Sequence, residues 1–485
     1  MSTIRLRHIG LLAVAILSFA ACQAQAPEPS AHEAPAGPNI LFLAVDDLRP
    51  ELGAYGRSEI HSPNIDRLAK RGLLFERAYV QQAVCSPSRT SLFTGLRPDA
   101  AKVWDLQTHF RDTVPDVVTL PQHFKQNGYH AEWWGKLYHA HLLDDQSWTR
   151  QGQRFEPEGN WRAYVTEEAK ALADANEGGG PPFERADVAD DAYPDGKIAN
   201  HAVEALQRLA QSDPPFFLAV GFYKPHLPFN APARYWDLYD PATIEPPELD
   251  HAPEGTPEIA LMNWGELRAY FGIPRKGDLD NDLTRQLIHG YRACVSYTDA
   301  QIGKVLDELA RLGLRESTIV MLWGDHGWKL GDYGDWCKHS NFELDTRAPL
   351  IVSAPGMKTR GQSTPALVEF VDMYPTLVEM AGLPLPDHLQ GTSFAPLLED
   401  PRQTWKDVAL SQYPRGTNMG RSMRTDRWRF TQWRSEEGAV IARELYDHDA
   451  SDPLEVRNLA DSPAHAETVK ELEALLDRRW KESLR

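Results

Sequence analysis

Residues 39–47 read Asn-Ile-Leu-Phe-Leu-Ala-Val-Asp-Asp. The apolar part, residues 40–45, is long enough for a strand and too short for a typical helix. An apolar run without alternation is typical of a parallel strand that is buried on both faces. We therefore expect residues 39–45 to form a central strand of an α/β sheet, with Asp46 and Asp47 at its carboxyl end.

Other short apolar runs repeat this pattern along the chain, at residues 131–134, 216–220, 318–323 and 350–352. Helical patterns separate them, at residues 63–71, 199–211 and 283–312. Strands that alternate with helices predict an α/β fold. We expect a large mixed, mainly parallel sheet that is sandwiched between helices.

The pattern changes beyond about residue 400. Residues 428–433 and 440–446 alternate like half-buried strands, and residues 464–483 have the periodicity of an amphipathic helix. We expect a main domain at residues 38–402 and a small C-terminal subdomain of antiparallel sheet plus helix at residues 403–485. Within the main domain, residues 229–282 are rich in Pro, Asp and Glu, and we expect a surface excursion over the rim of a site.

The N-terminus resembles a bacterial export signal. Arg5 and Arg7 precede a mostly apolar stretch, and Ala20-Ala21-Cys22 resembles a lipoprotein cleavage site. We expect residues 1–21 to be a signal peptide and residues 22–37 a flexible tether. Lipidation of Cys22 would anchor the protein to the outer membrane of a bacterium, whereas plain cleavage would leave it soluble in the periplasm.

The chain of 485 residues carries a formal net charge of −18 and four cysteines. No basic stripe appears in it, which argues against a nucleic-acid partner. Any attraction for an anionic substrate must therefore come from a local cationic pocket. Cys294 and Cys337 either pair or remain buried thiols, and we favour free thiols because a core of this size needs no disulfide.

A second informative stretch is Cys85-Ser86-Pro87-Ser88-Arg89, continued by Thr-Ser-Leu-Phe-Thr-Gly to residue 95. Pro87 suits the first turn of a helix and Gly95 suits its end. Cys85 would then lie at a helix N-terminus, where free N–H groups favour an anion. Arg89 would add a two-pronged donor for oxyanion oxygens. The alternative is a structural cysteine before an ordinary helix.

Polar residues follow four of the predicted strands: Asp46 and Asp47, Lys136 and His139, Lys224 and His226, and Asp325 and His326. Ligands bind at the carboxyl ends of strands in open α/β sheets, so we expect one common site. The acidic pairs offer hard oxygens and one imidazole, which suit a divalent cation, calcium by preference. The alternative for the first pair is an acidic loop that caps a helix. The candidate cationic and proton-transferring groups are Lys136, His139, His226 and Lys338.

The string at residues 85–95 resembles the signature of type I sulfatases, a family of the alkaline phosphatase superfamily. Residues 62–68, 135–136, 224–226 and 324–327 follow in the family's order. Within that family, residues 45–50, 222–229 and 325–342 are most similar to the iduronate-2-sulfatase branch. The resemblance covers the chain from about residue 38 onward.

This resemblance implies a formylglycine at position 85, made from the cysteine by a formylglycine-generating enzyme, whose hydrate attacks sulfur. It implies one calcium ion, with ligands Asp46, Asp47, residue 85, Asp325 and His326. Arg89 would steady the hydrate. Lys136 and Lys338 would bind the sulfate, and His139 would be the base that collapses the sulfated diol. His226, with Lys338, would protonate the leaving oxygen.

The implied activity is that of a sulfuric ester hydrolase that removes a 2-O-sulfate from a terminal uronic acid in sulfated polysaccharide fragments. We expect the sugar to contact Trp104, Asp105, His109 and Trp328, for which packing at the rim is the alternative. Two other functions stay open. One is a phosphonate or phosphodiester hydrolase of the same superfamily, and the other is a non-catalytic lipoprotein that captures sulfated glycans.

Overall fold

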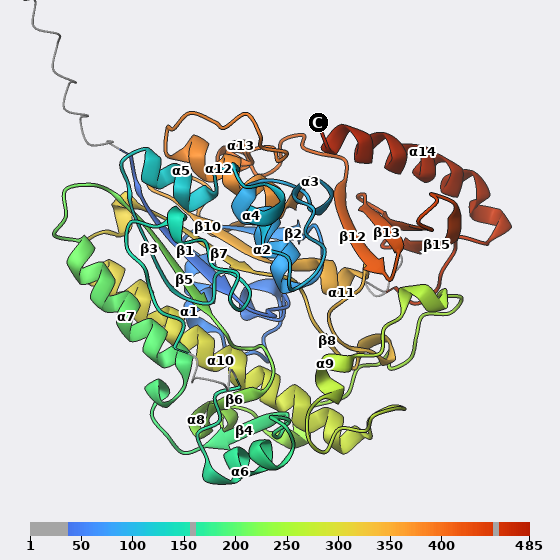
Figure 1. The fold of residues 1–485 in the computed structure, drawn as a ribbon, viewed down its shortest axis with the longest axis horizontal. Coiled ribbons are helices and arrows are strands. Elements are labelled where there is room, and N and C mark those ends of the chain that lie inside the picture. Colours follow the sequence, from blue (N-terminus) through green and yellow to red (C-terminus); the bar gives the residue numbers. More distant parts are fainter. Residues whose placement is uncertain (1–36, 156–161, 450–454) are drawn as a thin grey trace, which may run out of the picture. The chain divides into compact units, whose positions relative to one another are not determined.

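A computed structural model describes residues 37–155, 162–449 and 455–485. Its central sheet has seven strands in the order β11-β2-β10-β7-β1-β5-β3 (Figure 1). The strands are β1 (Asn39–Val45), β2 (Leu73–Tyr79), β3 (His130–Gly135), β5 (Phe216–Phe222), β7 (Thr318–Gly324), β10 (Arg347–Ser353) and β11 (Gln362–Glu369). Only β10 runs antiparallel to its neighbours in this sheet. The predicted mixed, mainly parallel sheet is confirmed.

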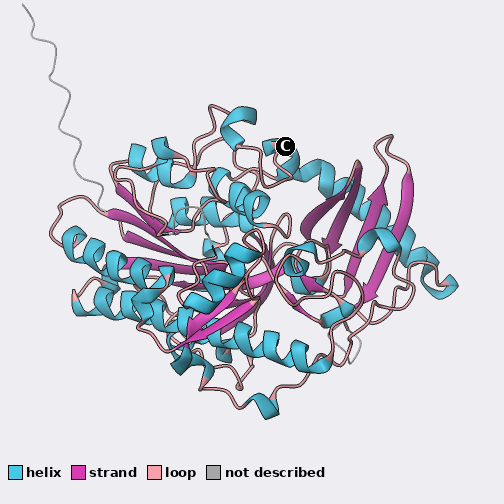
Figure 2. Ribbon diagram, turned by 60° about the horizontal axis from the view of Figure 1, so that its bottom comes forward, coloured by secondary structure: helices cyan, strands magenta, loops and turns pink. Residues whose placement is uncertain are grey.

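Alternate residues of β1 enter two different hydrophobic cores. Leu41 and Leu43 pack into one core, and Ile40 and Phe42 pack into the other. Helices cover both faces of the sheet (Figure 2). The first core contains residues of α1 (Pro63–Ala69), α7 (Pro194–Leu209) and α10 (Asn281–Arg311), and the second contains residues of α2 (Cys85–Thr94), α5 (Leu120–Gln126), α12 (Met373–Met380) and α13 (Ala395–Glu399). Because side chains alternate across a strand, a strand covered on both faces is apolar throughout.

The C-terminal part forms a second, antiparallel sheet in the order β12-β13-β14-β15. Its elements are β12 (Ala409–Arg415), β13 (Asn418–Arg424), β14 (Trp428–Arg434), β15 (Val440–Asp447) and α14 (Ala466–Ser483). Leu472 and Leu476 of α14 pack against Met423 and Phe430 of the sheet. The predicted sheet plus helix is confirmed, although the sequence pattern revealed only its last two strands.

Shorter elements connect these layers. They are α3 (Pro98–Ala101), α4 (Phe110–Thr113), α6 (Glu167–Ala175), β4 (Phe183–Ala186), β6 (Phe229–Pro232), α8 (Ala233–Trp236), α9 (Gly265–Arg268), β8 (Lys329–Leu330), β9 (Trp336–Cys337) and α11 (Glu343–Thr346). The excursion predicted at residues 229–282 contains β6, α8 and α9. Its Trp264 and Leu267 pack into the first core, so it is anchored to the body of the protein.

The predicted signal peptide, and the tether apart from Gly37, lie outside the described residues. In the part of the chain that the structure describes, none of the helices has both the length and the apolar character needed to cross a membrane. Cys294 and Cys337 are buried free thiols, which agrees with the alternative favoured from the sequence.

Candidate active site

Four of the predicted polar clusters lie at the carboxyl ends of β7, β1, β5 and β3, which are neighbours in the sheet. The N–H of Asp325 donates to the carbonyl of Val45 at 3.1 Å. The N–H of Asp46 donates to the carbonyl of Phe222 at the same distance, 3.1 Å. These bonds continue the sheet beyond its strands, so residues far apart in the sequence meet at one edge.

Asp46 and Asp47 both turn inward, although neighbouring residues of a strand point to opposite faces. Asp47 adopts a left-handed backbone with φ of 57°. Its N–H donates to Asp325 Oδ1 at 2.9 Å, and both side chains are fully buried. The carboxylates of Asp46 and Asp47 therefore lie within reach of one point beside Cys85.

His326 completes this acidic cluster. Its Nδ1 donates to the carbonyl of Gly327 at 2.9 Å, because a carbonyl can only accept. Its Nε2, which keeps a lone pair, lies 3.4 Å from Asp47 Oδ1. Burial, together with the carboxylates of Asp46 and other acidic neighbours, raises the pKa of Asp47 well above its usual range, although Lys338 opposes this. Three crowded carboxylates and an oriented imidazole fit a hard divalent cation.

Cys85 is the first residue of α2, as predicted, and Gly95 ends this helix in a left-handed conformation. Its Sγ lies 3.7 Å from Asp46 Oδ1 and 3.4 Å from His326 Nε2. Burial and the negative charge of Asp46 raise the pKa of the thiol well above its usual range. An unmodified Cys85 is therefore protonated, and a thiol is a much weaker nucleophile than a thiolate.

Arg89 does not line the cavity beside Cys85. Its Nε donates to Asp325 Oδ2 at 2.9 Å, and one terminal nitrogen donates to Asp46 Oδ1 at 2.9 Å. The other terminal nitrogen donates to the carbonyls of Lys136 and Leu137. The expected donor to a bound oxyanion is thus, in this structure, a fully buried brace that holds two carboxylates in place.

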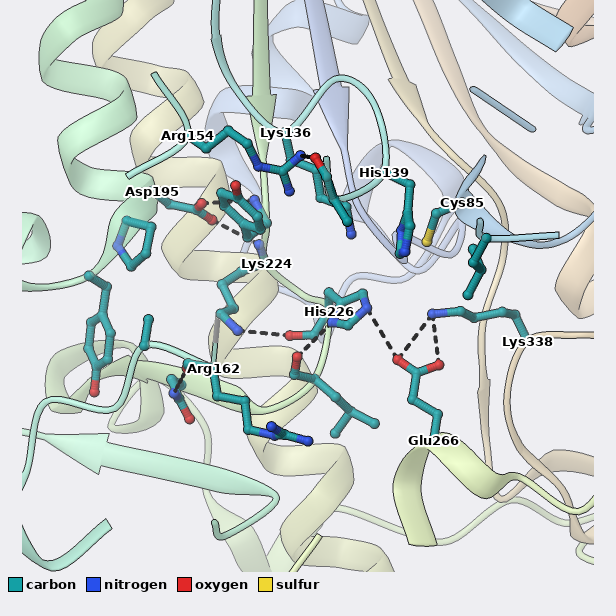
Figure 3. A pocket seen from close by; sticks show the side chains of 18 of the residues that line it. Cys85, Lys136, His139, Arg154, Arg162, Asp195, Lys224, His226, Glu266 and Lys338 are labelled. Carbon is teal, nitrogen blue, oxygen red and sulfur yellow. Dashed lines mark hydrogen bonds and ion pairs between the residues drawn. The ribbon is translucent and has the colours of Figure 1, made fainter. Parts of the chain in front are cut away.

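A cavity of about 400 Å³ opens beside Cys85 (Figure 3). Lys136, His139 and His226, from three of the predicted strand ends, line it together with Lys338. Lys136 Nζ pairs with Asp46, and Lys338 Nζ lies 3.1 Å from Asp47 Oδ1. The two lysines therefore border both the acidic cluster and the open space in which an anionic group would sit.

His139 is a neutral imidazole at this cavity. Burial and the positive charge of Lys136 lower the pKa of His139 to about 3. Its Nδ1 is buried without a hydrogen-bond partner among the described residues. The unused nitrogen of this neutral imidazole can accept a hydrogen bond, but a pKa of about 3 makes it a weak base in the substrate-free protein.

Lys338 is aimed at the cavity by an unusual backbone. Its neighbours Cys337 and His339 both have positive φ, of 69° and 88°. Left-handed non-glycine residues cost free energy and cluster at functional sites. The Nζ of Lys338 also lies 4.7 Å from the ring centroid of Trp328, a distance at which a cation is attracted to an indole face.

The four predicted sugar-contacting residues do not line the cavity; Leu106 lines it instead. Trp328 is fully buried, packs in the core and supports Lys338, so it presents no surface to a sugar. Trp104 Nε1 donates to Asp99 at 3.0 Å, and Asp105 accepts from backbone N–H groups of its own turn. His109 caps α4.

The structure adds cavity residues that the sequence argument missed. They are Arg154, Arg162, Asp195, Asn230 and Glu266. Asp195 accepts the N–H groups of Tyr223 and Lys224, at 2.8 and 2.9 Å, and so fixes the loop that carries His226. Asn230 and Glu266 lie in the excursion at residues 229–282, which the sequence predicts over the rim of a site, and Asn230 also directly follows the motif at residues 222–229.

Comparisons with known proteins agree with this geometry. A family model described as Sulfatase matches residues 38–383, and one described as N-sulphoglucosamine sulphohydrolase, C-terminal, matches residues 331–482. Iduronate 2-sulfatase of Homo sapiens is 33% identical over 537 residues, which cover 93% of this chain and 96% of that protein.

Solved structures share the fold. A 2-O GAG sulfatase superposes with a TM-score of 0.72 at 24% identity and covers 92% of both chains. A phosphonate monoester hydrolase from Silicibacter pomeroyi superposes with a TM-score of 0.74 at 22% identity, over 92% of this chain and 96% of that chain.

Proposed function

The chain belongs to the sulfatase family and hydrolyses sulfuric esters, and from that premise we propose that its substrate is a 2-O-sulfated uronic acid at the end of a sulfated polysaccharide fragment. The 33% identity to an iduronate 2-sulfatase supports this choice of sugar. A cavity of about 400 Å³ lies at the small end of the range for ligand pockets. This size supports one terminal sugar residue in the cavity.

The main support for this proposal is the position of Cys85. Its sulfur lies close to the acidic cluster, and the residue lines the cavity together with Lys136 and Lys338. A formylglycine at position 85 would supply a hydrated aldehyde as the nucleophile, a role for which the protonated thiol is poorly suited. The family resemblance assigns one calcium ion to Asp46, Asp47, residue 85, Asp325 and His326. In the structure the candidate ligand atoms form two groups that share Cys85, one with Asp46, Asp47 and His226 and the other with Asp325 and His326. Such an ion would neutralise charge on the sulfate oxygens.

Side chains of the protein would bind the sulfate and transfer the protons. Lys136 and Lys338 would bind the non-bridging sulfate oxygens. His139, whose Nδ1 has no hydrogen-bond partner among the described residues, would accept a proton from the nucleophile side. His226 donates its Nδ1 proton to the carbonyl of Leu227 at 2.6 Å, and burial, with the positive charges of Lys136 and Lys338, lowers its pKa well below the usual range. Its Nε2 therefore carries no proton, and the leaving sugar oxygen would take its proton from Lys338.

The mass of the peptide containing Cys85, from protein made in its native host, tests this proposal. We expect the loss that matches conversion of thiol to aldehyde. We also expect Cys85→Ala to abolish sulfate release without unfolding the protein. Cys294→Ala, which removes a buried thiol outside the cavity, is the matched control and should keep turnover. Full turnover by Cys85→Ala would contradict the proposal.

Two other functions predict different outcomes. The shared fold of the phosphonate monoester hydrolase favours a phosphonate or phosphodiester substrate as the second candidate. Matched sulfate, phosphate and phosphonate esters of one alcohol would separate the two. An unmodified Cys85 in well-folded native protein, with binding of sulfated glycans but no turnover, would favour the non-catalytic lipoprotein.

We also propose that a formylglycine-generating enzyme matures Cys85 and that the protein is exported to the periplasm or outer membrane of a bacterium. The basic and apolar pattern of residues 1–21 supports export, and Cys22 supports a lipid anchor. The mass of the mature N-terminal peptide tests both the export and the lipid anchor. A lipidated Cys22 at the new N-terminus is the expected result.

A further inference from the structure

Glu266 is a carboxylate that lines the cavity and has no role in the chemistry proposed above. Glu266, on α9, points toward His226 and Lys338 (Figure 3). Its Oε2 lies 2.9 Å from Lys338 Nζ, and its Oε1 lies 3.2 Å from His226 Nε2. An acidic side chain inside a pocket for anions is unexpected, because it repels the substrate. It must therefore act on the protein's own cations or on an uncharged part of the substrate.

We propose that Glu266 is a positioning residue for release of the sugar alcohol, which it promotes by holding His226 and Lys338 together at the leaving oxygen. This role rests on the proposed function. His226 and Lys338 come from different parts of the chain, the loop after β5 and the segment after β9. The Glu266 carboxylate contacts both side chains, and its bond to Lys338 sets where that proton donor lies relative to His226.

The backbone that carries Glu266 is firmly packed. Its neighbour Leu267 is fully buried in the first core, and Trp264 is buried just before α9. The guanidinium of Arg268 stacks on Trp264 at 3.2 Å from the ring centroid and donates to the carbonyls of Pro274 and Gly277. The Glu266 side chain is 20% exposed, so it reaches the cavity from a rigid base.

A third contact supports the carboxylate from behind. His339 Nε2 lies 3.6 Å from Glu266 Oε2, and His339 Nδ1 lies 2.7 Å from the hydroxyl of Tyr413 on β12. Although burial alone would raise it, Lys338 and His226 hold the pKa of Glu266 well below its usual range. The carboxylate is therefore ionised and accepts hydrogen bonds from its neighbours.

The chemistry of the step places Glu266 outside the transfer itself. As the bond between sulfur and the sugar oxygen breaks, its electron pair passes to that oxygen. The oxygen then takes one proton from Lys338 Nζ and leaves as the alcohol, while the unprotonated Nε2 of His226 can accept a hydrogen bond from the sugar. Glu266 neither gains nor loses a proton, because it only positions Lys338 and His226.

Two substrates with different leaving groups test this role. A sugar alkoxide needs a proton to leave, whereas the 4-nitrophenolate of 4-nitrophenyl sulfate does not. We expect Glu266→Gln to lower kcat for a 2-O-sulfated uronic acid by about 10- to 100-fold, with KM changed by less than about threefold. Turnover of 4-nitrophenyl sulfate should change by less than about twofold. Glu266→Asp, which keeps the charge, should recover part of the loss.

Glu258→Gln is the matched control, because Glu258 is an exposed carboxylate on the same excursion. It should leave both substrates unaffected. Equal losses on both substrates, or no loss on either, would overturn the positioning role while the proposed function stands. If the wild-type protein releases sulfate from neither substrate, the proposed function falls and this role falls with it. Thermal unfolding of each variant confirms that the fold is retained, and Glu266→Asp serves if Glu266→Gln does not fold.

Discussion

Two clusters of buried charge in this molecule differ in whether the cations outweigh burial and like charge at a central carboxylate; we call the cluster around Asp47 unbalanced and the cluster around Glu343 balanced. Asp47 lies close to Asp46, and its N–H binds Asp325. Arg89, Lys136 and Lys338 pair with these carboxylates, yet the pKa of Asp47 remains raised. At the junction between the main sheet and the C-terminal sheet, Glu343 instead faces two arginines. Arg429 lies 2.5 Å from Glu343 Oε2, and Arg424 Nε lies 3.3 Å from the same oxygen.

The pKa directions express this difference. Burial and neighbouring carboxylates raise the pKa of Asp47. Burial alone would also raise the pKa of Glu343, but Arg429 and Arg424 hold it far below its usual range. Asp46 and Asp47 contact Lys136 and Lys338, which line the cavity, whereas none of Glu343, Arg424 and Arg429 lines it. Crowded carboxylates next to an open space point to a functional site, whereas a carboxylate that arginines stabilise in a closed region holds the fold together.

The largest expected effect comes from breaking the unbalanced cluster. Asp47→Asn removes a ligand of the proposed cation and should lower kcat/KM by at least about a thousandfold. The free energy of unfolding of the metal-free variant should not fall, because one of several like charges is gone. Sulfate release and chemical denaturation in the presence of a chelator measure the two effects. Retained turnover together with a clear loss of stability would reverse the assignment of this cluster.

The balanced cluster should respond in the opposite way. Glu343→Gln leaves Arg429 and Arg424 with less compensating charge in a buried setting, and should lower the free energy of unfolding by about 3–5 kcal/mol. The kcat of the folded fraction should change by less than about twofold. Urea denaturation and sulfate release measure the two quantities. Glu467→Gln, in an exposed pair with Lys470, is the control and should cost less than about 0.5 kcal/mol.

Glu444, on β15 beside the balanced cluster, tests whether imbalance alone marks a functional site. It accepts hydrogen bonds from Trp433 Nε1 and from the hydroxyl of Tyr446, at 2.8 and 2.9 Å, yet burial raises its pKa to about 7. It does not line the cavity. We infer that an unbalanced carboxylate in a closed site takes up a proton, whereas one beside a cavity can hold a cation.

The proton on Glu444 makes the stability of the protein depend on pH. The folded protein keeps the proton on Glu444 up to about pH 7, whereas the unfolded chain loses it near the ordinary value of 4.5. Stability should therefore fall as pH rises between these values and stay level above them. Glu444→Gln cannot ionise, so its stability relative to the wild type should rise by about 2–3 kcal/mol from pH 5 to pH 8. Denaturation curves across that range measure it, and a constant difference would show that Glu444 is already ionised in the fold.

The strands and the strand-end residues could be predicted because burial on both faces leaves a direct trace in the sequence. Residues 39–45 match β1 to the residue. By contrast, β2 was missed because Glu76 and Arg77 interrupt its apolar pattern. Helix α7 was placed too late because its first turn, which contains Pro194, Asp195 and Gly196, has no helical periodicity.

The rest of the site depended on tertiary packing. Glu266 lies on a four-residue helix in a polar segment, and its direction is set by the burial of Leu267 in a distant core. Trp328 follows His326 closely in the sequence, which suggested contact with the sugar. However, nearness in sequence does not give the direction of a side chain, and the indole is buried where it supports Lys338.

The smallest expected effect concerns a hydrogen bond between the C-terminal sheet and His339, the residue that contacts Glu266 from behind. Tyr413→Phe removes the hydroxyl that holds His339 Nδ1 at 2.7 Å. Because a neutral hydrogen bond contributes about 1 kcal/mol, we expect kcat for the sugar sulfate to fall about two- to fivefold. Turnover of 4-nitrophenyl sulfate should not change, since that leaving group needs no proton. Tyr374→Phe, which removes a buried hydroxyl on α12 away from the cavity, is the control for both substrates. A loss for the sugar sulfate alone would mean that the C-terminal sheet helps to position the group that protonates the leaving oxygen, in addition to stabilising the fold. An equal loss on both substrates would show that this sheet has only a structural role.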